Sequence, residues 1–334
     1  MDYLNLKKYI VVTSIFQPTD AIIAFSSLNE YQLIVVGDKK TPVDWNHPNV
    51  CFISIEDQKQ MHFTLAQLLP YNHYSRKMLG YLKVIEDGAD FIVDTDDDNY
   101  PKINWGFPSY KGRFENLEDN LGFINIYQLF TKEKIWPRGL PLNLINQDFG
   151  LDNKINIKEC KVGIWQGLAD DDPDVDAIYR LTSNEPCFFT ERAPIVLGKG
   201  TISPFNTQNT IIRKELFPLM YLPTYVTFRF TDILRGLVAQ PIMWLYEYHL
   251  GFIHATVVQK RNPHDYMKDF ISEIPMYQYS EKIIDIVSGA ITLRNSINDN
   301  LYSAYHALQL NNIVSSKEMI TLEAWLTDMK TLFK

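Results

Sequence analysis

Four carboxylates follow a short hydrophobic run in the segment FIVDTDDDNYP, residues 91–101. They are Asp94, Asp96, Asp97 and Asp98, and because like charges repel one another, positive charge is expected among them. A D-x-D pair on the turn after a strand supplies the hard oxygen ligands that Mg²⁺ and Mn²⁺ prefer, while phosphate oxygens complete the shell. The bland alternative is a solvated acidic turn, but the apolar run before the cluster favours a divalent-cation site.

Two kinds of chemistry use such a motif. Phosphatases of the haloacid dehalogenase type take the first Asp as nucleophile and the second as acid/base, usually near the N-terminus with Gly and Thr or Val following. Here the motif comes after three earlier apolar runs and is followed by Asn99. The favoured interpretation is therefore transfer of a sugar from a nucleotide diphosphate, with the metal acting as Lewis acid on the leaving group.

The elements that must position this cluster alternate along the N-terminal third. The apolar runs 8–15, 31–38, 49–55 and 90–95 are typical of buried strands. Short helices are expected after Asp20 and over residues 75–86, the latter ending before Gly88. This alternation predicts an α/β fold with a mostly parallel sheet covered by helices on both faces.

Ligands of such sheets bind beyond the carboxyl ends of the strands, where Thr13, Asp38 and the acidic cluster are expected to meet. In the loop VVGDKKTPVDW, Asp38 is expected to bind a ribose or base edge, and Lys40 a diphosphate. Arg76 and Lys77 stand at a helix start, where cations are unfavourable to the helix dipole, which hints at an anion or carboxylate partner. Ordinary solvated polar loops would explain each of these alone.

Later segments add candidates for the sugar. The run 199–217 contains Asn206, Thr207, Gln208 and Asn209, whose side chains suit sugar hydroxyls. Asp232 and Arg235 are three apart at a helix start, where Asp232 is expected to act as base or to stabilise developing positive charge; a helix-end ion pair is the alternative. The acidic run 167–182 is interpreted as a solvated face or an acceptor loop.

Composition excludes several classes. The chain has 334 residues, 46% hydrophobic and 22% charged, with a net charge of −8, which argues against a broad nucleic-acid-binding surface. Its three cysteines suggest buried thiols rather than a disulfide framework. No signal peptide is visible, and the most apolar long window, 237–258, contains charged and polar residues, so we expect no transmembrane segment and a cytoplasmic location.

Four separated blocks together resemble the STELLO glycosyltransferase-like family: VVGDKKTPVDW, YSRKMLGYLKVIEDGADFIVDTDDDN, KGTISPFNTQNTIIRKELF and FRFTDILRGLVAQ. A fainter resemblance, carried by the Asp run, PDVDA and the Thr201–Asn209 segment, reaches the reversibly glycosylated polypeptides, which include UDP-arabinopyranose mutases. The resemblance implies a GT-A-like, Rossmann-like fold, a nucleotide-sugar donor that is UDP-linked, and Mn²⁺ or Mg²⁺.

Carried onto this sequence, the resemblance has Asp94, Asp96 and Asp98 hold metal and ribose, while Asp232 faces the transferred sugar. The polypeptides have a histidine after the late strand, where this chain has Gln259, with His264 five residues on; His264 is the candidate for the third metal ligand, and the choice between it and others is open. Asn209, Arg235 and Lys260 are further candidates for binding the nucleotide sugar.

The expected organisation is a GT-A-like catalytic domain over residues 1–275 and a C-terminal helical extension over 276–334 packed on it. A capping box, Ser315 with Glu318, is expected to start the last helix. A non-catalytic nucleotide-sugar-binding scaffold and a UDP-sugar mutase remain as alternatives. The donor sugar, the acceptor (glycan, lipid-linked or protein) and the stereochemical outcome are open at this stage.

Overall fold

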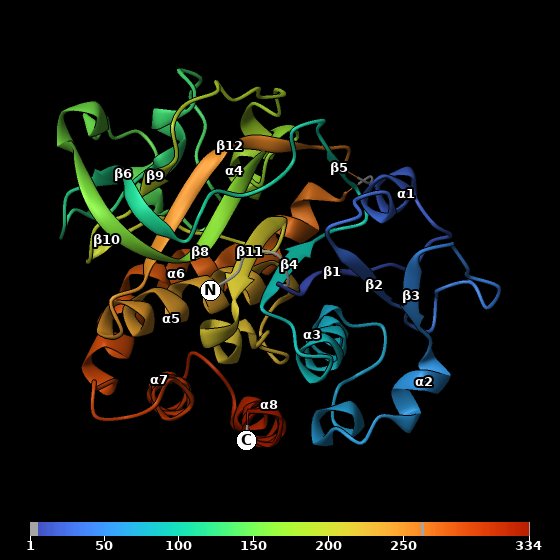
Figure 1. Ribbon diagram of the computed structural model, residues 1–334. Coiled ribbons are helices and arrows are strands. Elements are labelled where there is room, and N and C mark those ends of the chain that lie inside the picture. Colours follow the sequence, from blue (N-terminus) through green and yellow to red (C-terminus); the bar gives the residue numbers. More distant parts are fainter. Residues whose placement is uncertain (1–5, 262–263, 334) are drawn as a thin grey trace.

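A ten-stranded sheet organises the chain in a computed structural model that describes residues 6–261 and 264–333 (Figure 1). Its strand order is β3-β2-β1-β4-β11-β8-β6-β9-β12-β5. The first four strands in sequence are β1 (Lys8–Thr13), β2 (Gln32–Val36), β3 (Val50–Ile53) and β4 (Phe91–Thr95), close to the predicted runs. They pair in parallel, so that Thr13 lies opposite Val36 and Val11 opposite Asp94. Their carboxyl ends therefore meet at one edge.

The rest of the sheet is mixed, so the expectation of a mostly parallel sheet is not confirmed. Its strands are β5 (Asn99–Pro101), β6 (Lys111–Leu117), β8 (Ile155–Asp171), β9 (Ile195–Val196), β11 (Asn209–Arg213) and β12 (His249–Gln259). The strand β11 pairs antiparallel with both β4 and β8, whereas β12 pairs in parallel with β8. A separate two-stranded sheet joins β7 (Gly122–Phe123) to β10 (Thr201–Ile202).

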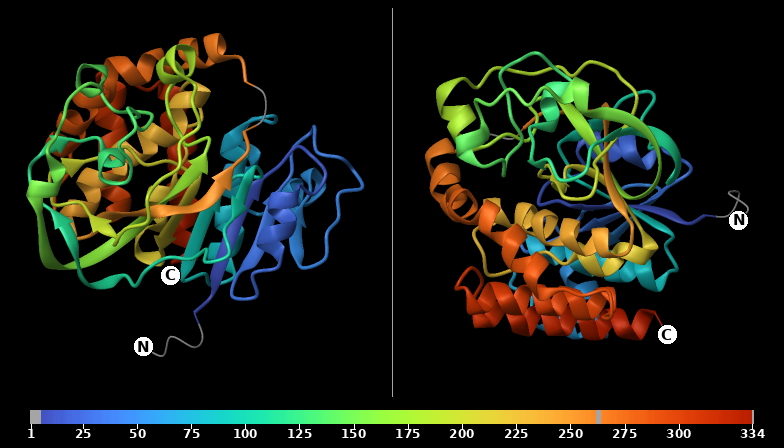
Figure 2. Two further views of the ribbon diagram at one scale, coloured as in Figure 1. Left: turned by 90° about the horizontal axis from the view of Figure 1, so that it is seen from above. Right: turned by 90° about the vertical axis from the view of Figure 1, so that its left-hand side faces the viewer.

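Most helices cover one face of the sheet in two layers (Figures 1 and 2). The inner layer holds α3 (Lys77–Glu86), α5 (Thr231–Leu245) and α6 (Tyr266–Ala290), and outside it lie α7 (Ile297–Leu310) and α8 (Ser316–Leu332). The opposite face of the N-terminal strands carries α1 (Asp20–Ser26). The remaining short helices are α2 (Ile55–Gln60) and α4 (Ala177–Thr182), with 3₁₀ turns η2 (Thr64–Gln67), η3 (Tyr74–Arg76), η4 (Ile126–Leu129), η5 (Leu142–Leu144), η6 (Leu151–Lys154), η7 (Lys214–Met220) and η8 (Phe228–Phe230).

The helix α3 lies unusually close to the sheet because of Gly80. A Cβ atom at this position would come within 2.7 Å of methyl carbons of Val11 and Val36, so a larger residue would push the helix away. Gly88 follows the helix with φ 81°, a left-handed conformation that suits glycine at a helix end, as the sequence predicts. The close packing fixes Lys77, at the first turn of α3, against β4.

The last helix departs from the prediction at its start. Ser315 is the N-cap residue of α8, but its side chain makes no capping hydrogen bond, so the predicted capping box is wrong. Glu318 instead turns into the core, where it is fully buried. The expected domain boundary at residues 275 and 276 falls inside the continuous helix α6.

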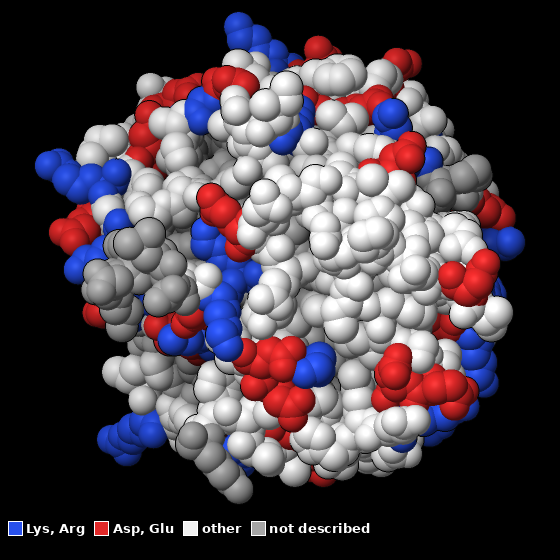
Figure 3. All heavy atoms as spheres, turned by 45° about the vertical axis from the view of Figure 1, so that its right-hand side comes forward, with Lys and Arg blue, Asp and Glu red and all other residues white. Residues whose placement is uncertain are grey.

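Three further expectations concern surface charge, cysteine burial and membrane-spanning helices. Figure 3 shows a broad area without charged side chains on one face, with acidic and basic residues interspersed around it. Cys160 and Cys187 are buried, as expected, whereas Cys51 is exposed. Within residues 6–261 and 264–333, no helix combines the length and apolar character needed to cross a membrane.

Candidate active site

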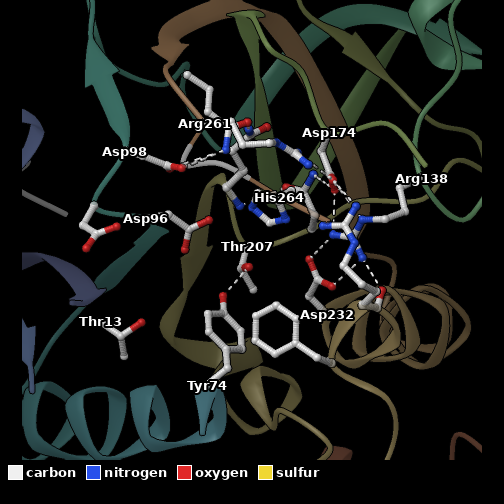
Figure 4. A pocket seen from close by; sticks show the side chains of 16 residues that line it. Thr13, Tyr74, Asp96, Asp98, Arg138, Asp174, Thr207, Asp232, Arg261 and His264 are labelled. Carbon is white, nitrogen blue, oxygen red and sulfur yellow. Dashed lines mark hydrogen bonds and ion pairs between the residues drawn. The ribbon is translucent and has the colours of Figure 1, made fainter. Parts of the chain in front are cut away.

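Two adjoining cavities, of about 230 and 250 Å³, lie at the carboxyl ends of β1, β2 and β4. They share the four residues Thr13, Tyr74, Asp97 and Phe228, so one ligand can span both. The first cavity is drawn in Figure 4, and its other lining residues are Asp96, Asp98, Arg138, Asp174, Asn206, Thr207, Gln208, Arg229, Asp232, Gln259, Arg261 and His264.

Positive charge lies beside the acidic cluster and comes from two buried basic side chains. Asp94 is fully buried, and its carboxylate pairs with Lys77 at 2.6 Å and with Arg235 at 2.7 Å. Burial alone would lower the pKa of Lys77, but its pairs with Asp94 and Asp96 outweigh burial and raise it. The charge of Asp94 is thus balanced without a metal, by one cation from α3 and one from α5.

Strand alternation explains why Asp94 differs from its neighbours. Side chains two apart on β4 share a face, so Asp94 lies with Ile92 on the helix-covered side. The turn after Thr95 then directs the later carboxylates to the sheet edge. Asp96, Asp97 and Asp98 all line the first cavity, and Asp97, which also lines the second, accepts a hydrogen bond from the Ser14 hydroxyl. Figure 4 shows Asp96 and Asp98 at this cavity.

The positive charges and hydrogen-bond donors around Asp96 and Asp98 do not fully offset the negative charge of the two carboxylates. Burial, together with Asp98 and Asp94, raises the pKa of Asp96 to about 7, even though Lys77 lies 3.3 Å away. Burial and Asp97 also raise the pKa of Asp98, whose nearest amide donor is Gln259 at 3.4 Å. A divalent cation between Asp96 and Asp98 would remove this cost, and two carboxylates are a donor set that suits Mg²⁺ or Mn²⁺. The residues present therefore fit such an ion.

The third ligand is not preformed. Among the residues that the structure describes, no group of three or more His, Cys, Asp or Glu side chains is arranged to hold a metal ion. His264 lines the same cavity, but its Nδ1 lies 3.0 Å from Asp269. Oxygens of a bound diphosphate would have to complete the coordination shell.

Asp232 lies across the first cavity from Asp96 and Asp98, in a rigid buried network (Figure 4). Arg138 donates to both oxygens of Asp232 at 2.9 and 2.7 Å, and to both oxygens of Asp174 at 2.8 and 2.7 Å. Burial would raise the pKa of Asp174, but Arg138 and Arg229 outweigh it and lower the pKa well below the usual range. Asn206 adds a 2.7 Å hydrogen bond to Asp174. Asp174 is therefore held as an anion, and the hydrogen bonds from Arg138 fix the positions of both carboxyl groups.

The second cavity has a different character. It is lined by the ends of β1 and β2 and the residues that follow them, Ser14 and Gly37, and by four residues of the loop 72–76: Asn72, His73, Tyr74 and Arg76. Asp38 accepts hydrogen bonds from the backbone N–H groups of Lys39 and His73, which fixes its carboxylate at the cavity edge beside Lys40. Apolar side chains, Ile15 and Phe16, line the mouth. A planar base with a ribose matches this mixture of flat, apolar and polar groups.

Eight of the twelve predicted site residues line the two cavities. They are Thr13, Asp38, Lys40, Arg76, Asp96, Asp98, Asp232 and His264. The guanidinium of Arg76 is nevertheless bound to the side-chain oxygen of Gln58 and the carbonyl of Leu69. The sequence predicts an anion or carboxylate partner for the cations at this helix start. The structure shows that Lys77, and not Arg76, forms ion pairs with carboxylates there.

The other four predicted residues lie outside the lining of both cavities. Asp94 and Arg235 form the buried ion pair described above. Asn209 is buried and hydrogen-bonded to Trp105 and Thr256. The other three candidates for sugar hydroxyls, Asn206, Thr207 and Gln208, do line the first cavity. Lys260 is exposed, with its ammonium 4.9 Å above the ring of Tyr100.

Sequence reasoning missed three residues: Arg138, Asp174 and Arg229. Arg138 follows Trp136 and Pro137 in the irregular stretch between η4 and η5, and no local pattern marks it. Asp174 belongs to the acidic run 167–182, which is not a solvated face, because Asp170, Asp174 and Asp176 are buried. The alternation of β4 is a second signal for Lys77, because it predicts that Asp94 faces inward and needs a buried cation.

With this geometry in view, known proteins were compared. Residues 229–334, from the start of α5 to α8, match the family model for STELLO glycosyltransferases. "Probable glycosyltransferase STELLO2" of Arabidopsis thaliana is 30% identical over 257 residues, which cover 71% of this chain and 34% of that protein. "Probable glycosyltransferase STELLO1" from the same plant is 25% identical over 350 residues, covering 98% of this chain and 45% of that protein.

The resemblance to the STELLO-type glycosyltransferase-like family is confirmed. The chain spans about a third to just under half the length of the two STELLO proteins that it matches. The segment matched by the STELLO family model contains Asp232, Gln259 and His264 of the first cavity, together with the outer helices α7 and α8.

Proposed function

We propose that this chain is a metal-dependent glycosyltransferase of the GT-A type that takes a UDP-linked sugar as donor. The observation that carries the proposal is the pair of connected cavities, one ending in Asp96 and Asp98 and the other shaped for a nucleoside. The two STELLO relatives, both named probable glycosyltransferases, support transferase chemistry. The acceptor is left open.

The donor would lie along the edge of the sheet. The uracil and ribose occupy the second cavity, between the ends of β1 and β2 and the loop Asn72–Arg76, with Asp38 at the ribose. The diphosphate then passes Thr13 and Asp97, which belong to both cavities, and reaches Asp96 and Asp98. The sugar enters the first cavity beyond them.

Asp96 and Asp98 would hold Mn²⁺ or Mg²⁺, which when bound offsets the charge of the leaving diphosphate. His264 and Gln259 lie close enough to the same cavity to orient the diphosphate or the metal's water ligands. The buried cation Lys77 holds Asp96 from behind, so that its carboxylate keeps one direction before the donor arrives. A site fixed in advance needs little rearrangement during the reaction.

At the sugar end, Asp232 is suited to stabilise rather than to attack. Both of its oxygens already accept hydrogen bonds from Arg138, so the carboxylate is fixed and its charge is shared with a cation. It can still accept hydrogen bonds from sugar hydroxyls and face the positive charge that develops at the anomeric carbon. Asn206, Thr207 and Gln208 supply neutral donors and acceptors for the remaining hydroxyls.

Calorimetry of the Asp96→Ala variant tests the proposal. Wild-type protein should bind UDP and UDP-sugars in the presence of Mn²⁺, and the variant should lose the Mn²⁺-dependent part of the affinity while keeping its fold. Asp285→Ala is the matched control, because Asp285 is an exposed aspartate on α6, outside the lining of both cavities. Unchanged metal-dependent affinity in Asp96→Ala would reject the assignment.

Product analysis separates the alternatives. A transferase releases UDP from a donor when an acceptor or water takes the sugar, whereas a nucleotide-sugar-binding scaffold binds the donor without release. A UDP-sugar mutase converts the donor without releasing UDP. A phosphohydrolase would release phosphate from simple esters with no preference for UDP.

A thermal-shift screen of nucleotide sugars with and without Mn²⁺ would choose the donor for these assays, because a ligand bound by the native state raises its apparent stability.

A further inference from the structure

Two buried carboxylates project from the outer helix α8 toward loops of the sheet domain. Glu318, near the start of α8, accepts hydrogen bonds from the backbone N–H groups of Thr224 at 2.8 Å and Tyr225 at 2.7 Å, and from the hydroxyl of Tyr221. Asp328, near its end, accepts from the backbone N–H groups of Thr64 and Leu65, both at 2.9 Å. Side chains with exposures of 0% and 5% therefore hold the main chain of two distant segments.

The first of these segments leads into the first cavity. Residues 221–225 continue directly into η8, which supplies Phe228 and Arg229 to the cavity lining, and then into Asp232 at the first turn of α5. The segment is also tied on its other side, because the N–H of Arg229 donates to the hydroxyl of Ser272 on α6 at 3.1 Å. The backbone before Asp232 is thus clamped between α6 and α8.

The second segment leads into the second cavity. Asp328 binds the two N–H groups at the start of η2, and this turn runs on to Leu69, whose carbonyl accepts a 2.9 Å hydrogen bond from Arg76. Residues 72–76 form a wall of the second cavity. Asp328 is therefore linked to the second cavity through residues 64–76, a short stretch of chain that is held by hydrogen bonds.

Each carboxylate is the acceptor for two backbone N–H groups of another segment. An apolar side chain of similar size would leave those donors without an acceptor, which is costly in the interior. What a carboxylate adds is direction, since it fixes two successive N–H groups at once. Each of the two therefore sets the path of a backbone segment rather than the packing of α8.

We propose that α8 is a brace for the donor site, in which Glu318 positions the sugar end and Asp328 positions the nucleoside end. Both are positioning residues, because each acts through the segment that it holds and touches neither donor nor metal. The assignment of the two ends rests on the proposed function. The brace itself rests on the hydrogen bonds from α8.

Matched variants of α8 test the brace. Glu318→Gln and Asp328→Asn keep shape but turn an amide N–H₂ toward a backbone donor, and Glu323→Gln is the control because Glu323 is exposed on the same helix. Glu318→Gln should lower the rate of UDP release by roughly ten- to hundredfold with the affinity for UDP in Mn²⁺ retained. Asp328→Asn should weaken UDP affinity roughly tenfold and leave the rate at saturating donor close to wild type. The control should change neither.

Amide hydrogen exchange reports on the brace without any activity. Exchange should quicken around residues 222–230 in Glu318→Gln and around residues 64–76 in Asp328→Asn, each without the other. Exchange that rises evenly over the chain would mean a general loss of stability and would overturn the brace. The same holds if the rate of UDP release and the affinity for UDP fall together in both variants. Exchange, rate and affinity equal to those of wild type in both variants would also overturn it. If wild-type protein fails to bind UDP, the proposed function falls, and the exchange pattern alone then upholds or overturns the brace.

Discussion

Removal of Lys77 is the perturbation that best tests why four carboxylates are tolerated after β4. Lys77→Met keeps the length of the side chain and suits the interior of a helix, but leaves Asp94 with Arg235 alone and Asp96 with no protein cation. Because Lys77 and Asp94 are both fully buried, no water can replace the lost ammonium. The variant should therefore be much less stable than its change in size implies.

The expected cost is about 3–5 kcal/mol in the free energy of unfolding, the usual range when one partner of a buried ion pair is removed. This is a large part of the roughly 5–15 kcal/mol that stabilises a typical domain. The remaining pair with Arg235 should keep the loss toward the lower end. Urea unfolding followed by circular dichroism measures the difference, provided that the transition stays cooperative.

Lys59→Met is the matched control. Lys59 forms an ion pair of similar length with Glu56, 2.7 Å, but the two side chains are 52% and 75% exposed. Water already screens this pair, so its loss should leave the unfolding free energy unchanged within error. Equal stabilities of Lys77→Met and Lys59→Met would refute the reasoning, because they would show that Asp94 does not depend on a protein cation.

Two further predictions concern Asp232 and pH. Asp232→Asn should slow UDP release by roughly 100-fold and leave UDP affinity unchanged, because Asp232 lies at the sugar end; wild-type turnover would speak against its role. Burial raises the pKa of Asp176 from 3.8 to about 6, so the folded state holds that proton more tightly and the unfolding free energy should fall by about 2 kcal/mol between pH 4 and 6. The Asp176→Asn variant keeps an acceptor for the N–H of Tyr179 but has no titrating group, so its unfolding free energy should not show this fall. Urea unfolding of both proteins at pH 4 and 6 measures the difference, and the same pH dependence in variant and wild type would contradict the assignment.

The N-terminal half of the site was accessible from the sequence because it depends on local patterns. Apolar β-branched runs predict β1 to β4, and parallel pairing brings their polar ends together without further information. This places Thr13, Asp38, Asp96 and Asp98 at one edge, where the structure has them.

The sugar end was not accessible, because its contacts join residues far apart in the chain. Arg138 meets Asp174 across 36 positions and Asp232 across 94, and no periodicity links them. The long strand β8 also escaped prediction, since its first half is polar and exposed, and only its second half is buried. Its pairing with β11 and β12 makes the sheet mixed.

The same limit explains the misassigned carboxylates. Glu318 follows Ser315 by three residues, the spacing of a capping box, but the interior offers it two backbone N–H groups and the hydroxyl of Tyr221. Asp174 belongs to an acidic run that resembles a solvated surface, and Arg138 makes its burial favourable. A partner contributed by another segment decides both cases, and one sequence does not reveal it.

Anomalous scattering from crystals grown with Mn²⁺ and UDP tests the central claim most directly. The account predicts one manganese peak bonded to the carboxylates of Asp96 and Asp98 and to oxygens of the diphosphate, with the uridine in the cavity beside Asp38. Bound UDP with no manganese between Asp96 and Asp98, or with manganese at another place, would contradict it.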